Sequence, residues 1–174
     1  MTSISSHIMI PAYSAEQAGL IFSLRLVTNT HPACTIHTYG TIAQALENSL
    51  RRMLSIMSSL KNEWRTLTNF GYTLHSETLA ICVKDARSAS LALAIALLNI
   101  YRQIQQQPVV PLTGTGIVRI DGSIESAQFE QCKRLALRHC ALNPPAFLTA
   151  SDCRHLFQLE SLMHMESINL RSTL

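Results

Sequence analysis

The apolar decapeptide LALAIALLNI, from Leu91 to Ile100, constrains the fold more than any other stretch of this sequence. It contains one polar residue, Asn99, and is much shorter than the roughly 20 residues that a membrane-spanning helix needs. An apolar run without a polar face predicts a helix that is buried on all sides inside a domain. Because 47% of the 174 residues are apolar, the chain has enough material for one good core, and we expect a single domain.

The rest of the chain alternates between strand-like and helix-like patterns. Strands are expected at 19–27, 34–39, 78–83, 112–120 and 146–150, with the first two forming an antiparallel pair. Helices are expected at 41–64, 88–105, 127–139 and 151–159, followed by an extended segment at 163–170. Residues 1–17 have no clean period, so we expect an N-terminal arm before one domain over 18–174. This order predicts an α+β, or mixed α/β, fold with helices packed on β-sheets.

Composition argues against several classes of partner. The net charge is only +3, 14% of the residues are charged and no dense basic run occurs, so we expect no nucleic-acid partner. The five cysteines include no C-x-x-C pair, and the seven histidines are scattered, so we expect reduced thiols, no metal and no other cofactor. The start of the sequence lacks the pattern of a secretory signal, which predicts a cytoplasmic protein that does not enter a membrane.

The polar segment KDARSAS, residues 84–90, leads directly into the apolar helix and allows two interpretations of Ser88. In the first, the Ser88 hydroxyl caps the helix by accepting a hydrogen bond from a backbone N–H of the first turn. In the second, Ser88 is a nucleophile, which needs a base to take its proton. No histidine stands at a persuasive position near it, but a lysine serves as a base if burial lowers its pKa.

Lys133 is the candidate base because it lies beside the apolar stripe of the expected helix 127–139. The alternative is that Lys133 buries only its aliphatic stem and extends its ammonium group to water. From the helix pattern alone, this alternative is the favoured interpretation.

Several segments together resemble the proteolytic domain of Lon proteases, peptidase family S16, over most of the chain. GTIAQALENS (40–49) is similar to the family's Gly-Ser-Leu-Gly-x-x-x-x-Glu-Ser helix start, and KDARSAS to its Lys-Asp-Gly-Pro-Ser-Ala-Gly. Thr113-Gly114 matches the family's Thr-Gly at the same offset from the serine. IDGSIESAQFEQCKRLAL (120–137) resembles the family's strand, turn and lysine helix, with two extra residues before Lys133.

The resemblance implies the fold of ribosomal protein S5 domain 2 and a Ser-Lys dyad. Ser88 falls on the nucleophile, Lys133 on the base and Thr113 on the residue that orients the lysine, while backbone N–H groups near Ser88 would form the oxyanion hole. It also implies a homo-oligomer, commonly a six-membered ring. The chain contains no ATP-binding motif, so such an enzyme would cleave unstructured polypeptides or act with a separate ATPase unfoldase.

The sequence also departs from the family pattern around the serine. Ala86-Arg87 replaces the family's Gly-Pro, and Ser90 replaces its glycine. Arg87 would bind a substrate carboxylate, or Asp85 would pair with Lys133 and keep it charged. The sequence therefore leaves two hypotheses, an ATP-independent Lon-like endopeptidase and a catalytically inactive domain that binds or assembles proteins.

Overall fold

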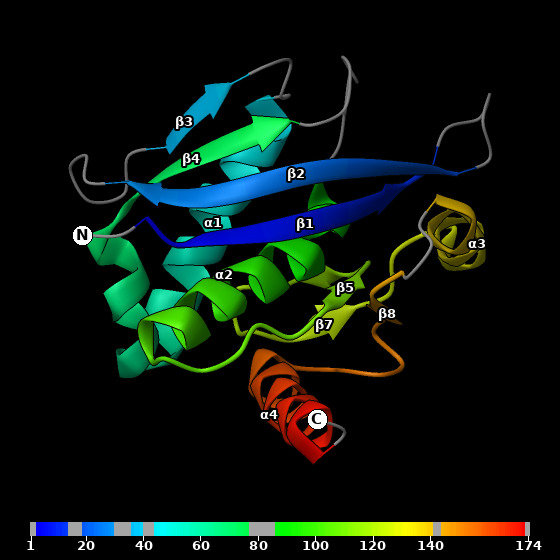
Figure 1. The fold of residues 1–174 in the computed structure, drawn as a ribbon. Coiled ribbons are helices and arrows are strands. Elements are labelled where there is room, and N and C mark those ends of the chain that lie inside the picture. Colours follow the sequence, from blue (N-terminus) through cyan, green and yellow to red (C-terminus); the bar gives the residue numbers. More distant parts are fainter. Residues whose placement is uncertain are drawn as a thin grey trace.

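Helix α2 (Ser90–Ile104) runs between a four-stranded sheet and a layer of short strands (Figure 1). Every side chain from Leu91 to Ile100 is buried, as the apolar run predicts. The computed structural model describes residues 3–13, 19–29, 36–39, 44–76, 86–140 and 144–172. The other helices are α1 (Gln44–Leu60), α3 (Glu130–Cys140), α4 (Leu156–Ser172) and the 3₁₀ helices η1 (Asn62–Asn69) and η2 (Arg87–Ala89). Helices packed with small sheets confirm the predicted α+β class.

The larger sheet has the strand order β1-β2-β4-β3. Its strands are β1 (Ser5–Ala12), β2 (Leu20–Asn29), β4 (Gly71–Ser76) and β3 (Ile36–Tyr39). Strand β2 is antiparallel to β1 and β4, whereas β3 is parallel to β4. Apolar residues alternate along β1 and β2, so that Ile8 lies opposite Leu24 and Ile10 opposite Phe22, with all four side chains buried. This alternation supplies the face of the sheet that packs in the core.

Two predictions about this sheet were wrong. Residues 5–12 are not part of an arm but an edge strand, because Ser6, Ile8 and Ile10 repeat every second residue and are buried. Segments 19–27 and 34–39 do not pair with each other either, since β4 enters between them from much later in the chain. The strand expected at 78–83 lies outside the described residues.

Helix α1 begins and ends inside the expected range of 41–64. Its buried side chains recur at helical spacing and are Leu46, Leu50, Met53, Leu54, Ile56 and Met57. The chain continues into η1 after Leu60, where Trp64 and Leu67 are buried as well. The first residues of the predicted helix, 41–43, lie outside the described residues.

The strand expected at 112–120 is interrupted in its middle. It divides into β5 (Leu112–Gly114), parallel to β8 (Ala146–Leu148), and β6 (Ile117–Val118), antiparallel to β7 (Ile124–Glu125). The break occurs because Gly116 exchanges backbone hydrogen bonds with the start of α2. The expected turn at Asp121-Gly122 is present, with Gly122 at a φ of +83°.

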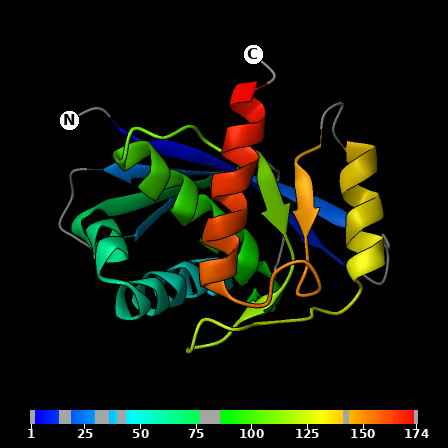
Figure 2. The same cartoon turned by 90° about the horizontal axis from the view of Figure 1, so that it is seen from below.

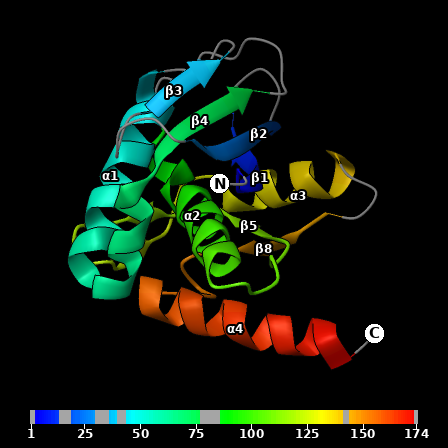
Figure 3. The same ribbon diagram turned by 60° about the vertical axis from the view of Figure 1, so that its left-hand side comes forward.

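Helix α4 replaces both elements that we expected after residue 150. The expected short helix over 151–159 and the expected extended segment at 163–170 were both wrong, because one helix starts only at Leu156 and continues through 163–170. Leu156, Leu159 and Met163 are buried at helical spacing, so the pattern continues through the segment that we expected to be extended. The helix runs beneath α2, β5 and β8 (Figure 3).

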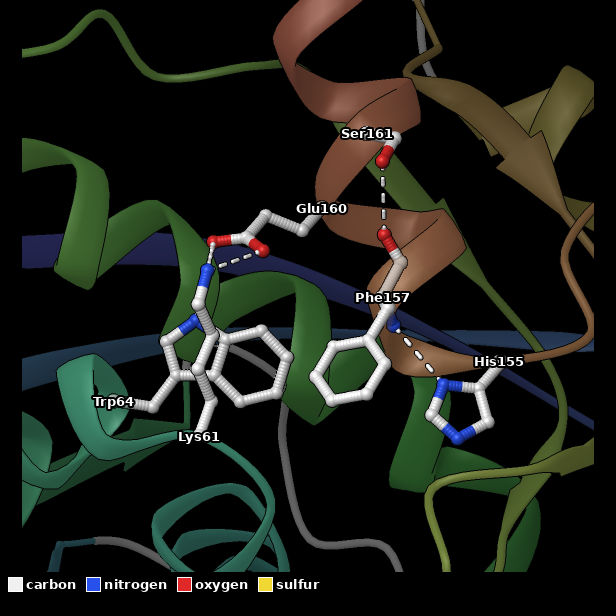
Figure 4. Close-up of polar contacts among 6 residues, drawn as sticks. All are labelled: Lys61, Trp64, His155, Phe157, Glu160 and Ser161. Atoms are coloured by element: carbon white, nitrogen blue, oxygen red, sulfur yellow. Dashed lines mark hydrogen bonds and ion pairs between the residues drawn. The ribbon is translucent and has the colours of Figure 1, made fainter.

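An ion pair connects α4 to the end of α1. Lys61 Nζ lies 2.8 Å from Glu160 Oε2, and the Trp64 indole N–H donates to Glu160 Oε1 at 3.3 Å (Figure 4). At the start of the helix, the Phe157 N–H donates to His155 Nδ1. Within the described part of the chain, no helix combines the length and the apolar character needed to cross a membrane.

Candidate active site

Ser88 lies in η2, the short turn that continues directly into α2. Its side chain is half-buried, and its hydroxyl oxygen accepts a hydrogen bond from Lys133 Nζ at 3.3 Å. The cap residue of α2 is Ala89, which makes no side-chain capping bond. The structure therefore places the Ser88 hydroxyl against the lysine instead of on the first turn of the helix.

The backbone of residues 115–118 holds the serine turn in position. The Gly116 N–H donates to the Ser88 carbonyl at 3.1 Å, and the Leu91 N–H donates to the Gly116 carbonyl at 3.3 Å. The buried Ser90 hydroxyl donates to the Gly116 carbonyl and accepts from the Val118 N–H at 2.8 Å. The serine that replaces the family's glycine thus joins the start of α2 to β6.

Lys133 reaches this turn from α3, on the opposite side of the molecule from α1 (Figure 2). Only 4% of the residue is exposed, and its amine donates to Ser88 Oγ and, at 3.1 Å, to Thr115 Oγ1. Burial lowers the pKa of Lys133 below its ordinary 10.5, and the nearby Glu130 carboxylate opposes this shift only in part. No carboxylate of the described residues forms an ion pair with the lysine. Burial therefore favours the neutral amine, the form that accepts a proton.

Thr115, not Thr113, is the threonine that contacts the lysine. The Thr113 hydroxyl donates to the Met9 carbonyl of β1, so the structure contradicts the orienting role that we expected for it. Thr115 Oγ1 accepts from Lys133 Nζ and donates to the Ser88 carbonyl at 3.3 Å, and Thr115 is fully buried. Sequence reasoning missed this residue, although Thr-Gly occurs twice, at 113–114 and at 115–116. Matching the second copy moves the two extra residues from the segment before Lys133 to the segment between Ser88 and the threonine.

The other predicted site residues have different positions. Gly114 is buried in β5, where a Cβ atom would come within 2.7 Å of the Leu148 carbonyl oxygen, so it supports the packing of β5 on β8. Arg87 is exposed beside Ser88. Asp85, which we considered as a partner of Lys133, lies outside the described residues.

The start of α3 is tied to the end of β1 by two aromatic rings. Tyr13 and Phe129 stack with their ring centroids 3.8 Å apart and an interplanar angle of 11°. Phe129 has a φ of +60°, a conformation that costs a non-glycine residue roughly 1–2 kcal/mol, and its carbonyl accepts the Lys133 N–H. The stack therefore helps to hold the turn of α3 from which the lysine projects.

The site contains the groups needed for acyl transfer except a defined oxyanion hole. A neutral amine within hydrogen-bond distance of a hydroxyl is the arrangement in which the amine removes the hydroxyl proton during attack on a carbonyl. The Ala89 N–H already donates to the Ala86 carbonyl at 3.0 Å, so another donor would have to stabilise the oxyanion. Among the described residues, no group of three or more His, Cys, Asp or Glu side chains is placed to hold a metal ion.

Comparison with known proteins does not assign the chain to a family. No protein-family model matches the chain, and no curated protein matches it.

Proposed function

We propose that this chain is a Lon-like serine endopeptidase in which Ser88 and Lys133 form the catalytic dyad. The observation that carries the proposal is the hydrogen bond of 3.3 Å from the buried Lys133 amine to Ser88 Oγ. A lysine that only covered the surface would extend its amine to water, whereas this one directs it into the protein toward two hydroxyl groups. The resemblance of the surrounding segments to the Lon proteolytic domain supports the same assignment.

In the proposed reaction, Ser88 Oγ forms a bond to the peptide carbonyl carbon while neutral Lys133 takes the hydroxyl proton. The carbon–nitrogen bond then breaks, and Lys133 returns that proton to the leaving amine. A water molecule hydrolyses the acyl-enzyme by the same sequence of steps. Thr115 accepts a hydrogen bond from the lysine amine and so positions it throughout.

The proposal also covers the substrate, the location and the oligomeric state of the enzyme. We expect an ATP-independent cytoplasmic enzyme that cleaves unstructured polypeptides, alone or beside a separate ATPase unfoldase. We also expect a homo-oligomer, and sedimentation velocity would measure whether its size is that of a six-membered ring.

The test is cleavage of a fluorescently labelled unfolded protein, without ATP, by the wild type and by Ser88→Ala and Lys133→Ala. Removing a general base typically lowers the rate by about 10²–10⁴-fold, so we expect both variants to lose cleavage while circular dichroism shows that they remain folded. Because the neutral amine is required, cleavage by the wild type should rise with pH through the lowered pKa of Lys133. Cleavage that survives either substitution would contradict the proposal.

A catalytically inactive protein-binding or assembly module is the second candidate. It is favoured by the turn before the serine, where Ala86 and Arg87 replace the family's Gly-Pro and the Ala89 N–H is already bonded. A folded wild type that cleaves nothing, and whose partner binding is unchanged in Ser88→Ala and Lys133→Ala, would support this candidate.

A further inference from the structure

A cavity of about 230 Å³ lies beside the serine turn, on the side of the turn that packs against α1. Its wall is formed by the first half of α1, by the turn that contains Ala86 and Arg87, and by β6. Ile117 and Val118 supply an apolar floor, while Ser49 and Arg52 supply polar groups from α1. The cavity is therefore amphipathic and has room for one side chain.

The charge at this cavity is positive. Arg52 and Arg87 both line it, and the described lining residues include no acid. Arg52 is exposed and forms no ion pair with another described residue. Among the described carboxylates of the adjoining elements, Glu47 pairs with Arg51 and Glu125 with Arg119. A carboxylate that entered the cavity would thus meet Arg52 without displacing any acid of the described residues from its guanidinium group.

The cavity is close enough to the nucleophile to receive part of a substrate. Arg87 and Ser90 both line the cavity. Arg87 immediately precedes Ser88 in the sequence, and Ser90 comes two positions after Ser88. Consecutive Cα atoms are about 3.8 Å apart, so the wall of the cavity begins within one residue of the reacting hydroxyl. In an extended peptide whose scissile carbonyl lies at Ser88, the side chain of a residue within about two positions of the scissile bond can therefore reach the cavity.

We propose that this cavity is a specificity subsite for an acidic side chain, with Arg52 as its principal ligand and Arg87 at its rim. The inference rests on the proposed endopeptidase function and adds its substrate class, which is polypeptides with Glu or Asp next to the cleaved bond. A guanidinium binds a carboxylate through two parallel hydrogen bonds, and the planar group discriminates a carboxylate from the amide of the same shape. The apolar floor contacts the methylene groups of the bound residue.

The experiment measures peptide binding to Ser88→Ala, which keeps the cavity but does not cleave. Two fluorescein-labelled unstructured peptides are compared by anisotropy, one with two central Glu residues and the other with Gln in their place. A hydrogen bond to a charged group contributes enough to predict at least tenfold tighter binding of the Glu peptide. This preference should disappear with Arg52→Gln and remain with Arg138→Gln, a control at an exposed arginine of α3 that does not line the cavity.

The outcomes separate this inference from the proposed function. Equal affinity for the two peptides, no binding of either, or a preference that survives Arg52→Gln would overturn the subsite. A wild type that binds the Glu peptide with the Arg52-dependent preference but cleaves neither peptide would support the subsite and contradict the endopeptidase. Because Arg52 is exposed, thermal unfolding should show that its replacement leaves the fold intact.

Discussion

Replacing Thr115 with Val tests the geometry of the dyad, with Thr113→Val as its matched control. Both threonines are buried and lie two positions apart, and the substitution removes only a hydroxyl group from each. The Thr115 hydroxyl contacts Lys133 and the Ser88 carbonyl, whereas the Thr113 hydroxyl contacts the Met9 carbonyl. The two variants therefore separate the loss of the lysine contact from the general cost of burying an unpaired polar group.

Both variants should lose some stability, and Thr115→Val should lose more because its hydroxyl makes two hydrogen bonds. Each hydrogen bond contributes about 1 kcal/mol net, so Thr115→Val loses about 2 kcal/mol of unfolding free energy and Thr113→Val about 1 kcal/mol. Urea unfolding measures both values. A domain of ordinary stability, about 5–15 kcal/mol, remains folded after either change, so the functional readouts stay interpretable.

The effects on the lysine should differ sharply. In Thr115→Val, the buried amine loses one of its two hydrogen-bond acceptors, which stabilise its charged form, so the pKa of Lys133 should fall further below 10.5. Nitrogen NMR of the lysine side chain measures this directly. Displacement of the base should lower kcat/KM about 100-fold, whereas Thr113→Val should change it less than about threefold.

One pattern of results would refute this reasoning. If Thr113→Val altered the lysine titration and the rate while Thr115→Val left both unchanged, then Thr113 would orient the lysine, as the sequence offset suggested. If the rate fell in both variants only in proportion to their loss of stability, then neither hydroxyl group would position the base.

Two further predictions concern stability. Because burial lowers the pKa of Lys133, the unfolded chain binds the lysine proton more tightly than the folded chain, so the stability of the wild type should rise with pH between the lowered pKa and 10.5. Lys133→Met should be more stable than the wild type at pH 7 and should lose this advantage as the pH rises through that range. A Met variant whose stability depends on pH in the same way as that of the wild type would exclude a buried lysine with a lowered pKa. Gly114→Ala should lower the unfolding free energy by about 1–3 kcal/mol, because its Cβ would lie 2.7 Å from the Leu148 carbonyl oxygen; a urea midpoint equal to that of the wild type would contradict the close packing of β5 on β8.

Sequence patterns predicted the fold where one physical signal dominated. The stretch from Leu91 to Ile100, which is apolar at every position except Asn99, predicted the buried central helix because it has no polar face to turn toward water. Edge strand β1 was missed because its alternation includes a buried serine, Ser6, and therefore looks polar. Helix α4 was misjudged since the residues around Met163 combine apolar, polar and charged groups, and only their burial against α2 reveals the period.

The site shows the same division between local and tertiary information. Ser88 and Lys133 were named as candidates from their local surroundings and assigned as a dyad from the family resemblance, and the structure brings their side chains within hydrogen-bond distance. The choice between Thr113 and Thr115 depended on where the strand over 112–120 breaks, which is decided by hydrogen bonds from Gly116 to the start of α2. The paired rings of Tyr13 and Phe129, far apart in the sequence, gave no local signal at all.

The separation of Ser88 and Lys133 along the chain has a consequence for the newly made protein. Their side chains meet across 45 positions, so a ribosome completes the serine turn well before it adds the lysine. Until α3 docks on the hairpin of β1 and β2, the Ser88 hydroxyl has no amine beside it and remains as unreactive as any alcohol. For the proposed peptidase, the order of synthesis would thus delay assembly of the dyad until α3 has been made and has docked.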